Sequence, residues 1–131
     1  MQIFDNDYYL SGNDDVRIAI ESGVFETALQ HFELYGGQEL RAPNEFFDPS
    51  FYLTQNMDVA GAIAFNVFKH PFHHYILFGQ FEDRVPSSLY LGFDSESYLE
   101  SNPDVAVAIS AKVFASAFQH FISFGQFENR P

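Results

Sequence analysis

Two groups of polar residues in this sequence have side chains of the kinds that bind metal ions. His70, His73 and His74 lie together near the middle of the chain, and His70 and His74 have the four-residue spacing that places two imidazoles on one helix face. Paired imidazoles suit zinc. Pro71 favours a helix start beside them, however, and no carboxylate accompanies them at a useful spacing. We therefore predict no metal site and keep His70 and His74 as the candidate ligands to check.

The second group is the acidic stretch "DNDYYLSGNDD" at residues 5–15. Carboxylates are calcium ligands, but this stretch lacks the central glycine and the closing glutamate of an EF-hand loop. The chain as a whole carries a formal net charge of −12, so many of its acids are expected on a solvated face. The sequence predicts no cofactor, and calcium is the ion that its acidic surface would favour.

Residue patterns that mark catalytic sites are missing from the sequence. It has no G-x-S-x-G, no P-loop, no G-x-G-x-x-G and no H-E-x-x-H, and it contains no cysteine. We therefore predict that the protein is not an enzyme. Its acidity opposes contact with phosphate backbones, so no nucleic-acid partner is expected. No apolar run reaches the length of a membrane span, and the opening "MQIFDNDYYL" lacks the features of a signal peptide.

The remaining polar residues of interest recur because the chain is a tandem repeat. Residues 4–41, 47–84 and 93–130 align without a gap, and fifteen of their 38 columns are identical. We call these ranges units one, two and three, within a single structural domain of residues 1–131. A period of this length is typical of stacked supersecondary units. The linking segments "APNEF" and "VPSSLYLG" contain the Pro or Gly of a connector.

Each unit is predicted to contain about three short helices, so the fold class is all-α. The aspartate that opens each unit is expected to cap the first helix, and an asparagine the second. The third helix is expected to start at Thr27, His70 and Ser116 and to end at a left-handed glycine. The predicted caps and helix ends are Asp5, Asp48, Asp94, Asn13, Asn56, Asn102, Gly36, Gly79 and Gly125. Such short helices need neighbours, so the units should stack as a helical array or a compact bundle.

Three further columns are interpreted as structural contacts within or between units. The histidine column lies in an aromatic helix and is expected to be hydrogen-bonded in the core, and its three members should not converge on one ion. The Glu and Arg columns follow the glycine, where arginine can bridge carboxylates or helix-end carbonyls. These residues are His31, His74, His120, Glu39, Glu82, Glu128, Arg41, Arg84 and Arg130.

The two stretches "FDPSFYLTQNMDVAGAI…HHYILFGQFEDRVP" and "FDSESYLESNPDVAVAI…FQHFISFGQFENRP" resemble a known bacterial repeat, FDxxYYLxxNPDVAxA…HYLxFGxxEGRxP. Similar repeats occur in large secreted or surface proteins of cyanobacteria and other bacteria, some with RTX-type calcium repeats, and beside some glycosyltransferase domains. The resemblance covers nearly the whole chain. It implies an extracellular or cell-surface location but no reaction or ligand. Because the opening residues lack signal-peptide features, the expected export route does not use a classical signal peptide. Unit one departs from it at "NDDV" and "GGQELR", and Asp83 and Asn129 replace its usual glycine.

These observations together predict a non-enzymatic structural or interaction protein of the cell surface or extracellular matrix. Repeat units bury faces against their neighbours, and end units keep one face free. Free ends of this kind would let copies assemble head to tail into a ring or filament, or adhere to a surface. The expected partners are other copies, a cell-surface protein or a glycan. The alternative is a calcium- or glycan-binding module, in which aromatic rings stack on sugars.

Overall fold

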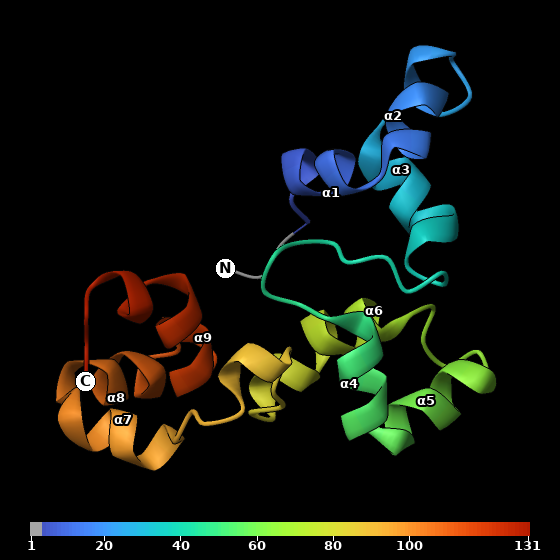
Figure 1. Ribbon diagram of the computed structural model, residues 1–131. Helices are drawn as coiled ribbons and strands as arrows, with labels where there is room; N and C mark the ends of the chain where they lie inside the picture. Colours follow the sequence, from blue (N-terminus) through green and yellow to red (C-terminus); the bar gives the residue numbers. More distant parts are fainter. Residues whose placement is uncertain (1–3) are drawn as a thin grey trace.

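Within residues 4–131, the range that the computed structural model describes, all regular secondary structure is helical, and this confirms the predicted all-α class (Figure 1). Unit one contains α1 (Asn6–Gly12), α2 (Asp14–Glu21), α3 (Ala28–His31) and the π-helical turn η1 (Phe32–Gly36). Unit two contains α4 (Pro49–Gln55), α5 (Met57–Ala64), α6 (Pro71–Leu77) and the 3-10 turn η2 (Gly79–Phe81). After the connector turn η3 (Ser88–Tyr90), unit three contains α7 (Ser95–Ser101), α8 (Pro103–Ser110), α9 (Ala117–Ser123) and η4 (Gly125–Phe127).

Aspartates cap the first helix of each unit. The side chain of Asp5 accepts a hydrogen bond from the backbone N–H of Tyr8 at 3.0 Å, which satisfies one of the free donors at the start of α1. Asp48 and Asp94 accept the equivalent bonds at the starts of α4 and α7. The capping bond joins residues three positions apart, so each aspartate fixes the start of the helix that follows it.

The asparagines do not cap the second helices as predicted. Asn13 lies at the start of α2, but its side chain makes no capping bond there. Its Nδ2 instead donates to the carbonyl oxygen of Tyr9 at 2.7 Å, and its Oδ1 accepts from Arg41 at 2.9 Å. Asn56 and Asn102 do the same in their units. The asparagine therefore joins the first helix to the arginine at the end of the unit.

The prediction that a left-handed glycine ends each third helix is also wrong. Among the glycines of the described residues, only Gly23 has a positive φ. The left-handed residues near the unit ends come four positions after the predicted glycines, and they are Leu40, Asp83 and Asn129, with φ of 61°, 57° and 56°. The third helix passes first into η1, η2 or η4, and the chain reverses only after that extra turn.

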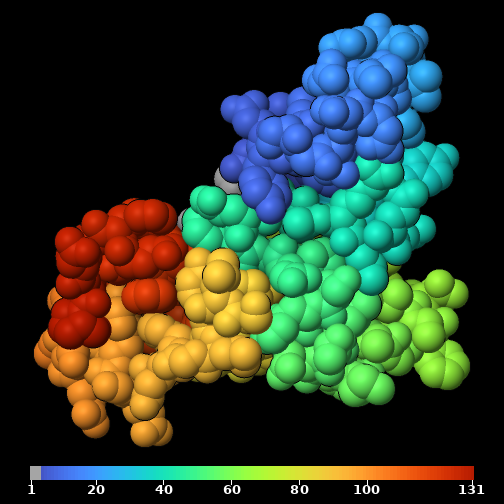
Figure 2. All heavy atoms as spheres, viewed as in Figure 1, coloured from blue at the N-terminus to red at the C-terminus, as the bar shows by residue number. Residues whose placement is uncertain are grey.

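The three main helices of each unit form one lobe. The lobe of α4 to α6 lies between the other two lobes (Figures 1 and 2). Aromatic rings fill the core of each lobe. In unit one the ring of Tyr9 packs against Phe4 and Phe32 with centroid distances of 5.1 and 5.6 Å. Apolar packing is continuous between units one and two, which share one buried cluster. Within residues 4–131, no helix has the length and apolar character needed to cross a bilayer.

Candidate functional site

A buried tyrosine–histidine pair recurs in every unit. The hydroxyl of Tyr9 and Nδ1 of His31 share a hydrogen bond of 2.9 Å, and the pairs Tyr52–His74 and Tyr98–His120 repeat it at 2.8 and 2.7 Å. Burial lowers the pKa of all three histidines and raises the pKa of Tyr9 to about 12. At neutral pH both partners are therefore uncharged. The constant spacing of 22 residues between these columns is the sequence signal for the pairing, which the sequence analysis did not predict.

The glycine after each third helix makes room for this tyrosine. A β-carbon placed on Gly36 would overlap the hydroxyl of Tyr9, and the same holds for Gly79 with Tyr52 and Gly125 with Tyr98. Gly36, Gly79 and Gly125 are thus required by close approach rather than by backbone conformation.

One arginine near the end of each unit ties the second helix to the terminal turn. Arg41 donates to both carboxylate oxygens of Asp15, at 2.9 and 2.8 Å, and to Glu39 at 3.0 Å. Together with the bond to Asn13 this forms what we call the arginine clamp. The same set recurs as Arg84 with Asp58, Glu82 and Asn56, and as Arg130 with Asp104, Glu128 and Asn102.

The clamp changes the acidity of its carboxylate partner. The hydrogen bond from Arg41 lowers the pKa of Asp15 to about 2, and Arg84 does the same to Asp58. These carboxylates remain mostly exposed, so solvent weakens the ion pair. The clamp consequently fixes geometry within a unit, and its guanidinium group is bonded to protein partners.

The histidines considered as zinc ligands are not arranged as a pair. Nδ1 of His70 accepts a hydrogen bond from the backbone N–H of His73, while Nδ1 of His74 is bonded to Tyr52. His70 caps α6 and lies between units one and two, whereas His74 faces the core of its own unit. Within residues 4–131, no cluster of three or more metal-ligating side chains is present.

Three of the four acids of residues 5–15 are engaged with separate partners. Asp5 caps α1, Asp14 lies 3.6 Å from Arg17, and Asp15 is held by Arg41. These contacts direct the carboxylates to different partners rather than around a common centre.

Unit one contacts unit two through aromatic rings. The ring of Phe32 lies 5.0 Å from that of His70 and 6.0 Å from that of Phe72, edge to face in both pairs. Gly37 approaches the ring of His70 so closely that a β-carbon there would overlap it. The end of unit one therefore packs onto the start of α6.

Unit two contacts unit three at the equivalent positions. Nε2 of Gln119 donates to Oε1 of Gln80 at 3.2 Å. Asp83 is hydrogen-bonded to Ser116, and burial raises the pKa of Asp83 above its usual range. Ser116 caps α9 as His70 caps α6, so the second contact uses the same surfaces as the first.

The two surfaces that form the contact between units are each exposed once, one in unit one and the other in unit three. At the start, Leu29 aligns with Phe72 and Phe118 and is 46% exposed, whereas those rings are 7% and 3% exposed. At the end, Gln126 aligns with the buried Gln80 but is only half-buried. We name these surfaces the leading face (Thr27, Leu29 and Gln30) and the trailing face (Phe121, Gln126 and Asn129).

The prolines of the two connectors are buried, which sequence reasoning missed. The backbone N–H of Asp5 donates to the carbonyl oxygen of Pro43, and that of Asp48 donates to Pro86, both at 2.9 Å. Each connector thus returns to the first helix of the unit that it leaves. The sequence signal for these buried prolines is the recurrence of a proline two positions after the clamp arginine in units one and two.

Comparison with known proteins assigns no further role to these residues. No protein family model, no curated protein and no solved structure matches this chain.

Proposed function

We propose that this protein is a non-enzymatic interaction module that associates head to tail with further copies of itself. The single observation that carries the proposal is the pair of open faces. Counterparts of leading-face residues contact the preceding unit in units two and three, and counterparts of trailing-face residues contact the following unit in units one and two. A contact between two different faces is heterologous, so it propagates into rings or filaments.

The chemistry of the polar residues supports a structural role over a catalytic one. Each histidine of the recurring column is neutral and bonded to a tyrosine, and each clamp arginine is bonded to carboxylates. These groups hold the units in shape. A location at the cell surface or outside the cell is part of the proposal, and it rests on the resemblance of the repeat to those of secreted proteins.

The net charge of −12 sets the conditions under which copies would associate. Copies of the same negative charge repel each other. At 0.1 M ionic strength, salt screens this repulsion at separations beyond about 10 Å. Association is therefore expected to strengthen with salt. Sodium chloride and calcium chloride at matched ionic strength separate screening from a specific calcium contact, with EDTA as the baseline.

The variant Leu29→Glu is expected to abolish concentration-dependent association. It places a carboxylate at the centre of the leading face without touching a core residue. Sedimentation equilibrium over a concentration series should show a rising mass for the native chain and a monomer for Leu29→Glu.

The matched control is Leu34→Glu. Leu34 is 54% exposed, and its counterpart in unit two, Leu77, is also exposed, so this position lies outside the contacts between units. The control should associate as the native chain does. A native chain that stays monomeric at all concentrations and salt conditions would contradict the proposed function.

A further inference from the structure

The contact between units one and two pairs a glycine with a histidine. A β-carbon on Gly37 would overlap the ring of His70, although Gly37 itself has helical dihedral angles, with φ of −60°. The imidazole is buried and packs edge to face on the ring of Phe32 at 5.0 Å. Gly37 is therefore required by the size of the imidazole and not by its own backbone conformation.

The contact between units two and three pairs a glutamine with a serine at the aligned positions. Gln80 replaces the glycine, and Ser116 replaces the histidine. Gln80 is buried, and its Oε1 accepts a hydrogen bond from Nε2 of Gln119 at 3.2 Å. Ser116 is also buried and caps the backbone N–H of Gln119 at 3.1 Å. A large residue of the preceding unit thus meets a small one of the following unit, the reverse of the first contact.

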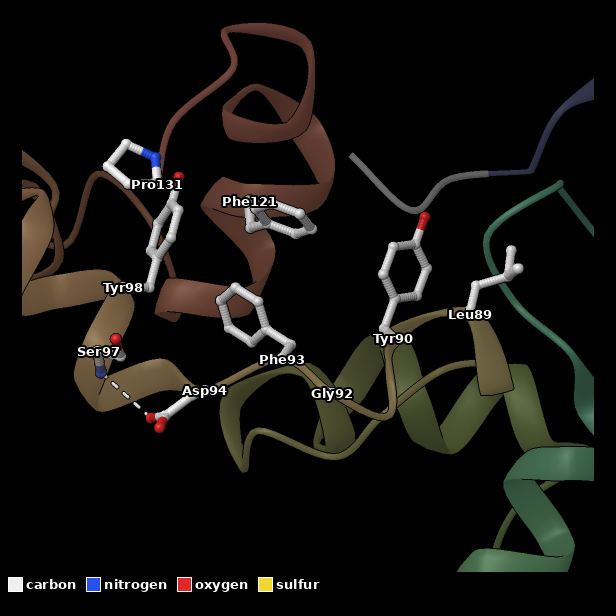
Figure 3. A pocket seen from close by; sticks show the side chains of 9 residues that line it. All are labelled: Leu89, Tyr90, Gly92, Phe93, Asp94, Ser97, Tyr98, Phe121 and Pro131. Carbon is white, nitrogen blue, oxygen red and sulfur yellow. Dashed lines mark hydrogen bonds between the residues drawn. The ribbon is translucent and has the colours of Figure 1, made fainter.

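Both contacts have an aromatic centre. In the first contact the ring of Phe32 lies 6.0 Å from that of Phe72. In the second, Tyr90 of the connector turn η3 lies 5.3 Å from Phe118, which aligns with Phe72, and 6.3 Å from Phe121. Figure 3 shows Tyr90 and Phe121 among the residues that line a neighbouring pocket of about 380 Å³. The two contacts therefore share their apolar character and differ in the sizes of the paired residues.

We propose that these pairs form a size-matching rule that determines which unit docks after which. Glutamine followed by histidine would place a side chain where the imidazole lies, and glycine followed by serine would leave a void in its place. Both mismatches cost stability, so the pairs fix the order of the units. We call the paired sites the end position (Gly37, Gln80 and Gln126) and the start position (Thr27, His70 and Ser116).

The same rule identifies the partner surface for association of copies, and this step rests on the proposed function. Unit three has Gln126 at its end position. Unit one has Thr27 at its start position, where it caps the N–H of Gln30 at 3.0 Å. This combination repeats that of the second contact, in which a glutamine meets a small capping residue and a further glutamine. The trailing face should therefore accept a leading face that starts with threonine or serine and reject one that starts with histidine.

A double-mutant cycle between Gly37 and His70 tests the rule within one chain. In the Leu29→Glu background, which is expected to keep copies apart, Gly37→Ala should lower the equilibrium constant of folding about 30-fold, because the β-carbon overlaps the imidazole. After His70→Ser, the same change should be neutral or raise the constant by up to about fivefold, because alanine favours a helix. Urea unfolding followed by circular dichroism measures both.

Gly36→Ala is the matched control for this cycle. Its β-carbon overlaps Tyr9 of the same unit, so its cost should be the same with and without His70→Ser. A cost of Gly37→Ala that His70→Ser does not relieve, or equal relief at Gly36, would overturn the rule.

The second contact supplies the reverse test, which does not depend on how well His70→Ser folds. Ser116→His should lower the folding constant about 30-fold, because the new ring meets Gln80. The cost of Ser116→His should be about tenfold smaller when Gln80→Gly is also present. An equal cost in the two backgrounds would contradict the rule.

Association of copies separates the rule from the proposed function. Thr27→His should abolish the rise of mass with concentration in sedimentation equilibrium, and Thr27→Ser should leave it unchanged. Native chains that stay monomeric would refute the proposed function alone, since the cycles within the chain need no association. Association that persists in Thr27→His would refute the matching rule alone.

Discussion

Gly79→Ala is expected to lower the free energy of unfolding by about 3 kcal/mol, the range for a forced overlap in a packed core. The new β-carbon would overlap the hydroxyl of Tyr52 and press on the ring of Tyr75. Tyr52 has no exposed surface, and its hydroxyl is bonded to His74, so the ring has no free space into which to move. Relief therefore requires breaking the buried tyrosine–histidine bond or shifting η2. Urea unfolding followed by circular dichroism measures the change.

Gly61→Ala is the matched control. Gly61 lies inside α5, and a β-carbon there meets no atom within 4 Å. The substitution should leave stability unchanged or raise it by about 0.5 to 1 kcal/mol, because alanine favours a helix and narrows the unfolded ensemble. Equal effects at the two glycines would show that close approach to Tyr52 is not what requires Gly79.

Acidification from pH 7 to pH 5 is expected to destabilise the protein strongly, and His70 should account for the largest share. Burial lowers the pKa of His70 to about 4, and Lys69 and His73 act in the same direction. The carboxylate of Glu33 lies 4.0 Å from Nε2 of His70. In the unfolded chain the imidazole titrates near 6.5. The stability of the folded state that depends on a neutral His70 is therefore complete above that pH and is lost as the pH falls toward 4. For His70 alone the loss by pH 5 is about 2 kcal/mol.

His70→Ser tests the assignment, because serine caps the third helix at the same position in unit three. The variant keeps the cap and removes the titrating ring. Its stability at pH 7 should fall through lost packing on Phe32 and Gly37, but its loss between pH 7 and pH 5 should be smaller than that of the native chain by about 2 kcal/mol. A pH dependence that is unchanged in His70→Ser would show that another group is responsible.

Local features of the fold were predictable because their causes lie within a few residues. Asp5 caps the N–H of Tyr8, three positions away, and Thr27 accepts from Gln30 over the same distance. Pro71 stands at the first position of α6, where its missing N–H has no cost. Such signals locate helix starts in a single sequence.

Features set by distant partners were not predictable in the same way. The partner that takes Asn13 away from a capping role is Arg41, 28 positions further along the chain. Gly36 was interpreted as a left-handed residue, although its real constraint is the hydroxyl of Tyr9. The left-handed position is instead that of Asp83 and Asn129, where the bacterial repeat that the sequence resembles usually has glycine.

The candidate site was predictable only as a set of columns. Recurrence singled out His31 and Arg41 as structural residues, but it did not distinguish contacts within a unit from contacts between units. That distinction depends on burial: Leu29 and Phe72 share a column, and only the structure shows that one is exposed and the other covered.

Disulfide formation between two singly substituted chains tests the head-to-tail contact most directly. The protein contains no cysteine, so Gln30→Cys and Gln126→Cys each introduce one thiol. The aligned residues Gln119 and Gln80 meet between units two and three, so Gln30 of one copy should meet Gln126 of the next. Under mild oxidation, an equimolar mixture of the two variants should form the mixed dimer in far more than the twofold excess over each homodimer that random pairing gives. A mixed dimer at no more than twice the yield of each homodimer, or no cross-linked product, would contradict head-to-tail association through these faces.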